Sequence, residues 1–198
     1  MADKTKKKSE FVRPTAEQIE AEIRRTDRKT RFGSLVRSTF YALVTVAAAA
    51  VLLSTLLMPV LKIYGNSMSP TLDEGEIVVA VKTSRFEQGD VLAFYYNNRV
   101  LVKRVIGGPG DWVDIDQEGV VKVNGVLLDE PYLIDRSFET CDIQLPYQVP
   151  DGQYFVMGDH RSTSIDSRTT AVGCVSAEQV VGRILFCVWP LGELRTIS

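Results

Sequence analysis

The sequence is poor in residues that bind metal ions. It contains one histidine, His160, and three cysteines, Cys141, Cys174 and Cys187. No two of these four residues stand at the short spacing typical of zinc sites, so we expect neither a metal nor a cofactor. The odd number of cysteines leaves at least one thiol unpaired within the monomer. The sequence does not decide whether two of the three form a disulfide.

The main part of the chain also lacks an excess of basic residues. Residues 1–37 carry a net charge of +5, so the remaining residues carry −7 of the total of −2. Nucleic-acid binding depends on a basic surface on the folded part of a protein, and here that part is acidic. We therefore expect no nucleic-acid partner.

A length of 198 residues allows one sizeable domain with appendages.

Residues 38–61 contain no charged side chain. As a helix, at about 1.5 Å per residue, they would cover about 36 Å, and a bilayer core is about 30 Å thick. The stretch is apolar on all faces and too long for an ordinary core helix. It is also longer than the roughly 7–15 apolar residues of a cleavable signal peptide, and its leading region is too long for one. We expect a permanent membrane anchor over residues 38–61.

The charge distribution around this anchor predicts its orientation. Basic flanks stay on the cytoplasmic side, so residues 1–37 are expected to be a cytoplasmic segment and residues 62–198 an extracytoplasmic domain. Within the cytoplasmic segment, residues 1–13 are polar and expected to be disordered. A short helix is expected from Thr15 to about Lys29, because Thr15 and Gln18 have capping-box spacing.

Beyond the anchor, the pattern is typical of short strands separated by turns. Asn97-Asn98 and Asn124-Gly125 are turn signals of the kind that join two antiparallel strands. Only a turn near residues 176–179 has helical character. The sequence therefore predicts a mostly β fold, an antiparallel β-rich domain with one N-terminal transmembrane helix. The expected strands are residues 77–81, 91–96, 100–106, 120–123, 126–128, 154–157 and 180–186.

Two residues of this domain have the chemistry of a hydrolytic site. Ser67 follows the anchor closely, and Lys103 interrupts an apolar strand. A serine hydroxyl needs a base, and a lysine can serve as one only if burial lowers its pKa from about 10.4. The alternatives are a turn serine and a strand lysine whose amine reaches water. His160 is better explained as a polar loop residue than as the base.

Three segments carry a resemblance to a known family. Residues 65–72 (GNSMSPTL), 101–111 (LVKRVIGGPGD) and 157–168 (MGDHRSTSIDSR) resemble, in order, the conserved boxes of bacterial type I signal peptidases. These are membrane-anchored serine–lysine endopeptidases that remove signal peptides. The resemblance covers roughly residues 38–192.

The resemblance implies a role for six residues. Ser67 would be the nucleophile and Lys103 the general base, and Ser164 would hydrogen-bond the lysine amine. Asp166 and Arg168 would form a scaffolding ion pair, and Met68 would lie beside the scissile bond. Two positions depart from the family pattern: Gly65 stands where some members have a hydroxyl that donates to the oxyanion, and His160 stands where asparagine is frequent.

The expected function is therefore hydrolysis of secretory preproteins at the membrane surface, after small side chains one and three residues before the cut. One alternative is a self-cleaving repressor of similar fold, against which the anchor and the lack of a DNA-binding domain count. The other is a membrane-tethered β-rich binding or assembly factor without catalysis. The sequence gives no indication of the oligomeric state.

Overall fold

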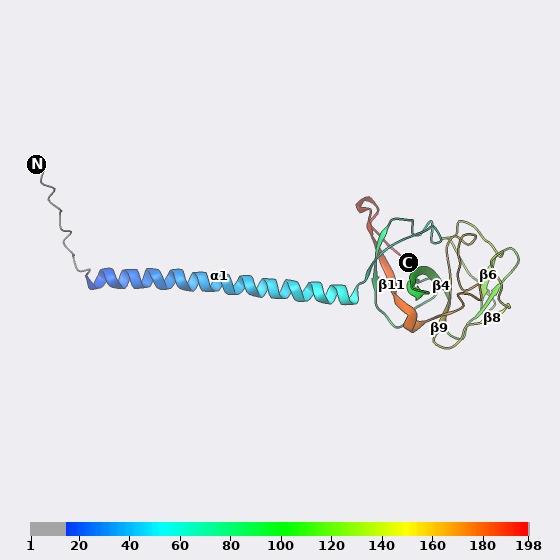
Figure 1. The fold of residues 1–198 in the computed structure, drawn as a ribbon, viewed down its shortest axis with the longest axis horizontal. Coiled ribbons are helices and arrows are strands. Elements are labelled where there is room, and N and C mark those ends of the chain that lie inside the picture. Colours follow the sequence, from blue (N-terminus) through cyan, green and yellow to red (C-terminus); the bar gives the residue numbers. More distant parts are fainter. Residues whose placement is uncertain (1–14, 198) are drawn as a thin grey trace, which may run out of the picture. The chain divides into compact units, whose positions relative to one another are not determined.

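The structure, a computed structural model, describes residues 15–197, and they fall into two units that divide after Leu52. The first unit is helical, and the second contains all of the strands (Figure 1). The disorder expected for residues 1–13 lies outside the described residues.

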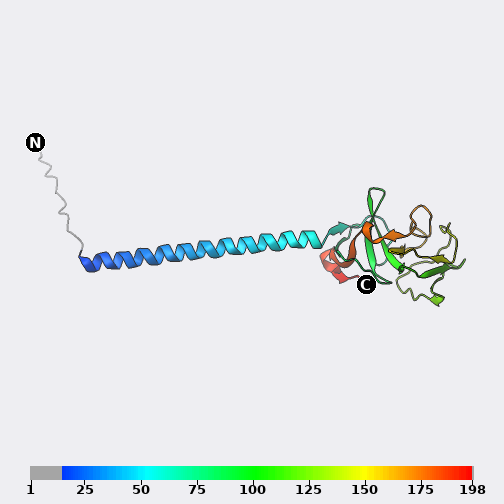
Figure 2. The same ribbon diagram turned by 90° about the horizontal axis from the view of Figure 1, so that it is seen from below.

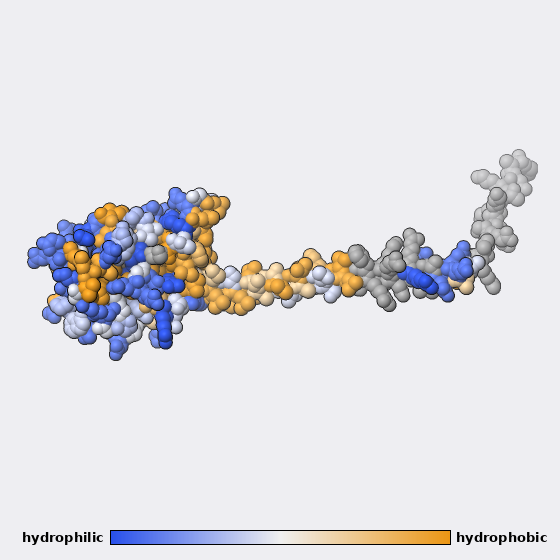
Figure 3. Space-filling model, turned by 180° about the vertical axis from the view of Figure 1, so that it is seen from behind, coloured by the Kyte–Doolittle hydropathy of each residue, from blue (hydrophilic) through white to orange (hydrophobic). Residues whose placement is uncertain are grey.

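A single long helix, α1 (Ala16–Leu57), occupies most of the N-terminal part. The short helix and the anchor that the sequence predicts separately are thus one continuous element. Its segment Leu35–Ser54 is long and apolar enough to cross a membrane and is not buried by any other part of the described chain. Figure 3 shows mostly hydrophobic residues on the visible face of this segment of α1.

The helix ends earlier than the sequence predicts. Met58 precedes Pro59, and a residue before proline disfavours the helical conformation. Residues 58–61, expected to belong to the anchor, therefore leave the helix, and residues 60–62 form a strand. The last helical carbonyl, Leu57 O, accepts a hydrogen bond from the Lys82 N–H at 3.2 Å.

The larger of two antiparallel sheets forms most of the β unit (Figure 2). Its strand order is β1-β2-β11-β3-β4-β9-β10, and β12 also pairs with β11. Asn97 and Asn98 both have positive φ, the geometry of a tight two-residue hairpin between β3 and β4. The strands are β1 (Val60–Lys62), β2 (Ile77–Val81), β3 (Val91–Tyr96), β4 (Arg99–Gly107), β9 (Gln153–Met157), β10 (Val175–Ser176), β11 (Val180–Trp189) and β12 (Arg195–Thr196).

The smaller sheet has the order β7-β6-β5-β8. The hairpin signal Asn124-Gly125 joins β6 to β7, with positive φ at both residues, as the sequence predicts. Its strands are β5 (Trp112–Ile115), β6 (Val121–Val123), β7 (Val126–Leu127) and β8 (Tyr147–Gln148). Single-turn 3-10 helices, η1 (Ala177–Gln179) and η2 (Leu191–Glu193), flank β11.

Buried apolar side chains join the two sheets. Ile106 of β4 and Phe155 of β9 pack with Val113 and Val121 of the smaller sheet in one cluster. Two further clusters cover the opposite faces of the larger sheet around Val78 and around Phe94. The predicted fold class, mostly antiparallel β with one N-terminal helix that could span a membrane, is confirmed.

The three cysteines are all free thiols in the structure, so none of the disulfides left open by the sequence is formed. Burial raises the pKa of Cys174 to about 11 and raises that of Cys141 and Cys187, which keeps these thiols protonated at neutral pH.

Candidate active site

Ser67 lies in a turn that directly follows β1. Gly65 has φ of +80°, a conformation that favours glycine, and it turns the chain after residues 60–64. Among the described residues, the Ser67 N–H has no hydrogen-bond acceptor, whereas the Ser67 carbonyl accepts a hydrogen bond from the His160 N–H at 3.1 Å. The turn thus fixes the Ser67 backbone and leaves its N–H free.

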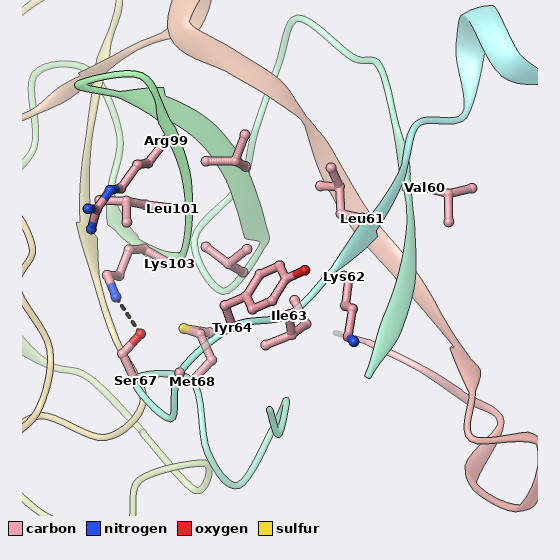
Figure 4. Close-up of a pocket in the computed structure, with 13 residues that line it drawn as sticks. Val60, Leu61, Lys62, Ile63, Tyr64, Ser67, Met68, Arg99, Leu101 and Lys103 are labelled. Atoms are coloured by element: carbon pink, nitrogen blue, oxygen red, sulfur yellow. Dashed lines mark hydrogen bonds between the residues drawn. The ribbon is translucent and has the colours of Figure 1, made fainter. Parts of the chain in front are cut away.

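Lys103 reaches Ser67 from strand β4. The Lys103 Nζ lies 2.6 Å from Ser67 Oγ, within hydrogen-bond distance (Figure 4). Lys103 is only 3% exposed, and its neighbour on β3 is the buried Leu92. The interpretation of Lys103 as a strand lysine with its amine in water is therefore wrong.

Burial changes the acid–base properties of this amine. It lowers the pKa of Lys103 from 10.5 to about 8, because an apolar environment disfavours the ammonium form. Asp166 and Asp159 raise the pKa again, and Arg168 lowers it. A pKa of about 8 leaves roughly one amine in ten neutral at pH 7.

The loop that holds Ser164, Asp166 and Arg168 is tied together by buried hydrogen bonds. Arg168 Nε and one terminal nitrogen donate to the two oxygens of Asp166, at 2.8 and 3.0 Å, and both side chains are fully buried. The same Asp166 carboxylate accepts from the Gly158 N–H at 3.0 Å. The ion pair expected between Asp166 and Arg168 is thus present.

Ser164 makes a different hydrogen bond from the expected one. Its hydroxyl donates to Asp166 Oδ2 at 2.7 Å, and the only hydrogen-bond partner of the Lys103 amine among the described residues is Ser67. Asp166 carries a negative charge, so it attracts the hydroxyl proton more strongly than a neutral amine does. The oxygen of Ser164 keeps lone pairs with which it can accept a further hydrogen bond.

Gly158 brings this loop against the nucleophile's turn. A Cβ at this position would lie 2.4 Å from Ser164 Oγ and 2.5 Å from the Ser67 carbonyl oxygen. Both distances are far below van der Waals contact. Only glycine allows the approach.

A second buried network beside the dyad was not predicted from the sequence. Arg104, the residue after Lys103, donates to both oxygens of Asp159, at 2.9 and 2.8 Å, and its guanidinium lies 4.0 Å from the ring centre of Tyr132. Arg161 pairs with Glu130 in a comparably buried position. The available signal was an arginine inside an apolar strand, since a buried charge requires a partner.

His160 is a loop residue, as expected. Its Nε2 lies 4.0 Å from Asp135 Oδ2, and its backbone N–H bonds to the Ser67 carbonyl.

A groove of about 660 Å³ leads away from Ser67 and Lys103. One wall comes from β1 and the residues after it, and the other from the first half of β4 (Figure 4). Met68 is only 2% exposed and closes the groove next to Ser67. The lining residues are Val60, Leu61, Lys62, Ile63, Tyr64, Gly65, Ser67, Met68, Arg99, Val100, Leu101, Val102 and Lys103.

Comparisons with known proteins show the family of this chain. The family model described as signal peptidase, peptidase S26, matches residues 36–189. Signal peptidase IB of Staphylococcus aureus is 39% identical over 153 residues, which cover 67% of this chain and 78% of that protein. Signal peptidase I of Bacillus licheniformis is 34% identical over 167 residues, or 78% and 89% of the two chains. A crystal structure of a signal peptidase I from Enterococcus faecalis V583 aligns with 32% identity and a TM-score of 0.41, and the alignment covers 50% of this chain and 96% of that one.

The β-rich unit, with its helix that could span a membrane, therefore belongs to a serine peptidase. More particularly, the chain belongs to the peptidase S26 family, the signal peptidases.

Proposed function

We propose that this protein hydrolyses the peptide bond that follows the signal peptide of secretory preproteins, with Ser67 as nucleophile and Lys103 as general base. The observation that carries the proposal is the 2.6 Å distance between Lys103 Nζ and Ser67 Oγ, at an amine whose pKa burial lowers to about 8. The names of the relatives supply the substrate class.

In the first step, the neutral Lys103 amine accepts the proton of the Ser67 hydroxyl as Oγ attacks the carbonyl carbon. The bond from Oγ to carbon forms, and the carbonyl electrons move to its oxygen. The intermediate collapses by breaking the carbon–nitrogen bond, and the Lys103 ammonium gives its proton to the leaving amine. The same amine then deprotonates a water, which releases the signal peptide from Ser67.

The free Ser67 N–H would stabilise the oxyanion, since Gly65 supplies no hydroxyl for this purpose. The bond from the His160 N–H to the Ser67 carbonyl supports this role, because it holds the peptide group on the other side of the same residue. Met68, buried at the edge of the groove, would contact the substrate beside the scissile bond.

Ser164, Asp166 and Arg168 would act as positioning residues. Asp166 holds the Ser164 hydroxyl and the Gly158 N–H, and Gly158 in turn contacts the Ser67 carbonyl region. We infer that a small rotation of Ser164 allows its oxygen to accept a hydrogen bond from the Lys103 amine during the reaction. Arg168 keeps the Asp166 charge from stabilising the ammonium form too strongly.

The protein would work with residues 1–37 in the cytoplasm, the apolar part of α1 that follows them in the bilayer and the β unit outside. Preproteins are anchored in the same bilayer by their apolar signal segments. Sharing a membrane raises the effective concentration of the substrate near the groove.

Cleavage of a preprotein by the full chain in detergent or vesicles tests the proposal. Ser67→Ala removes the nucleophile and is expected to lower the cleavage rate by up to about 10⁶-fold. Lys103→Ala removes the base and is expected to lower it by about 10²–10⁴-fold. Ser84→Ala and Lys122→Ala change an exposed serine and an exposed lysine away from the groove, and both should cleave at the unaltered rate. Undiminished cleavage by both Ser67→Ala and Lys103→Ala would contradict the assignment of these residues as nucleophile and base. A wild type that cuts no preprotein would favour the binding-factor alternative.

A further inference from the structure

The β4 wall of the groove carries a cation, Arg99, that takes no part in the proposed reaction. Side chains alternate along a strand, so Arg99, Leu101 and Lys103 lie on the same side of β4. Figure 4 shows these three side chains in a row along the groove. Lys103 contacts Ser67, and Arg99 lies at the other end of the row.

The guanidinium of Arg99 has no ion pair and no hydrogen bond with any residue in the range 15–197. Five other arginines of the β unit do contact a carboxylate: Arg104, Arg161, Arg168, Arg183 and Arg195. Arg99 is also exposed, at the end of the tight turn between β3 and β4. Its charge is therefore available to a molecule in the groove.

The groove as a whole is positively charged. Its lining contains Lys62, Arg99 and Lys103 and no aspartate or glutamate. Residues 38–198 as a whole carry a net charge of −7, so the groove differs in sign from the domain that contains it. A local field of this kind selects among ligands by charge.

The direction of the groove indicates which part of a substrate meets Arg99. Away from Ser67, the groove follows residues 64 to 60, which lead back to the end of α1 at Leu57. If the protein cleaves signal peptides, the part of the preprotein that precedes the cleaved bond comes from the bilayer. This part of the substrate would therefore lie along residues 60–64 of the groove. The released part would leave on the other side of Ser67.

The spacing gives the position. Arg99 is four residues from Lys103, which is about 13 Å along a strand at about 3.3 Å per residue. An extended substrate with its cut bond at Ser67 covers this length with about four residues. The free edge of β4 before Arg104, where pairing with β9 begins, is open to such an extended chain.

We propose that Arg99 is a specificity residue that favours an acidic side chain, and disfavours a basic one, four or five residues before the cleaved bond. This inference rests on the proposed signal-peptide cleavage and adds to it a charge preference at one substrate position. The carboxylate would pair with the free guanidinium, whereas a lysine at the same position would be repelled by Arg99.

Matched preproteins that carry Asp, Gln or Lys at each position from three to seven residues before the cut test the inference, with the full chain in vesicles. An exposed ion pair changes a rate by at most about fivefold. Attraction of Asp and repulsion of Lys together therefore predict that kcat/KM is about five- to twentyfold higher for the Asp substrate than for the Lys substrate. The ratio should peak four or five residues before the cut and shrink at high salt.

Variants separate Arg99 from the general field of the domain. Arg99→Gln should bring the ratio close to one, Arg99→Glu should reverse it, and Arg99→Lys should retain most of it. Arg136→Glu makes the same charge change at an exposed arginine outside the groove and should leave the ratio as in the wild type. Because each ratio compares two substrates on one enzyme, a loss of folded protein does not affect it.

The outcomes distinguish this inference from the function on which it rests. A wild type that cleaves all of the preproteins without charge preference, or an Arg99→Glu variant with the wild-type ratio, overturns the role of Arg99 and leaves the peptidase assignment intact. A wild type that cleaves none of them overturns the proposed function itself.

Discussion

At the scale of single residues, the burial of Lys103 determines what the site can do. The amine is 3% exposed and lies 2.6 Å from Ser67 Oγ, so it loses the hydration that would keep it charged. The surrounding charges oppose one another: Asp166 and Asp159 favour the ammonium form, and Arg168 disfavours it. Desolvation is the largest effect, and the result is a base that works near neutral pH.

This burial predicts the pH dependence of cleavage. Only the neutral amine accepts the Ser67 proton, so kcat/KM should rise tenfold per pH unit at low pH and level off above a pKa of about 8. The measurement is a pH profile of kcat/KM with a preprotein substrate. Lys103→Arg should be inactive across the whole range, because a guanidinium does not deprotonate in proteins. An acid limb centred near pH 6 or below would contradict the role of Lys103.

Gly158 provides a second prediction at this scale. Gly158→Ala places a Cβ within 2.6 Å of the Ser164 side chain and the Ser67 carbonyl oxygen, so the loop must move away from the nucleophile. We expect at least a hundredfold loss of kcat/KM, since small displacements at a reacting centre have large effects. Gly192→Ala is the matched control, because nothing lies within 4 Å of its Cβ position and its φ is not positive. Equal activity of the two variants would contradict the close packing at Gly158.

At the scale of elements, buried ion pairs hold the loop of residues 158–168 against β4. Arg104 and Asp159 are both almost completely buried, and they join the strand that carries Lys103 to the loop that carries Ser164. Thr71, which follows Ser67 in the chain, also bonds to Asp159, at 2.5 Å. The three boxes of the site are therefore connected through one carboxylate.

Removing one partner of this pair should destabilise the protein strongly. Arg104→Met leaves the Asp159 carboxylate buried without its partner, and we expect the free energy of unfolding to fall by about 3–5 kcal/mol. Arg183→Met is the control, because Arg183 is 38% exposed in its pair with Asp90 and should contribute only about 0–1 kcal/mol. Denaturant unfolding of the detergent-solubilised chain, followed by tryptophan fluorescence, measures both. Similar losses in the two variants would contradict the difference in burial.

The turns between strands were predictable at this scale, and three of the four two-residue strands were not. Asn124-Gly125 and Asn97-Asn98 have the positive φ that two-residue hairpins require. Asparagine and glycine are the residue types that favour this conformation, so the turns could be predicted from the sequence. Strands β8, β10 and β12 have two residues each, too few for any periodic pattern to register. They depend on partners distant in sequence. Strand β1 was not predicted, because its first residues are apolar and were assigned to the end of the predicted anchor.

At the scale of the whole molecule, one helix connects a basic N-terminal segment to an acidic β unit. The segment Leu35–Ser54 has no buried residues within the described chain, so its apolar surface needs an environment other than water. The short connection from Leu57 to β1 keeps the start of the groove within a few residues of the helix end.

The proposed orientation can be measured directly. A tag placed before residue 1 should be protected from added protease in intact spheroplasts and digested only after the membrane is opened, because basic flanks stay in the cytoplasm. The β unit should be accessible without opening the membrane. Replacing the basic residues of the first 37 by neutral ones should produce a fraction of inverted molecules. Digestion of the N-terminal tag in intact spheroplasts would contradict the orientation.

The sequence alone determined those properties that depend on local pattern and composition. These are the uncharged apolar stretch that could span a membrane, the alternation and turns that produce an antiparallel β unit, and the three segments that resemble the boxes of the family. Local signals of this kind remain in the chain whether or not it is folded.

Only the tertiary structure decided how these parts act on one another. Lys103 is 36 residues from Ser67, and its pKa falls because other strands exclude water from it. The bond from Ser164 to Asp166, the pairing of Arg104 with Asp159 and the lack of a partner for Arg99 among residues 15–197 depend equally on which side chains folding brings near. Burial and charge pairing are properties of distances through space, and the order of residues along the chain does not contain them.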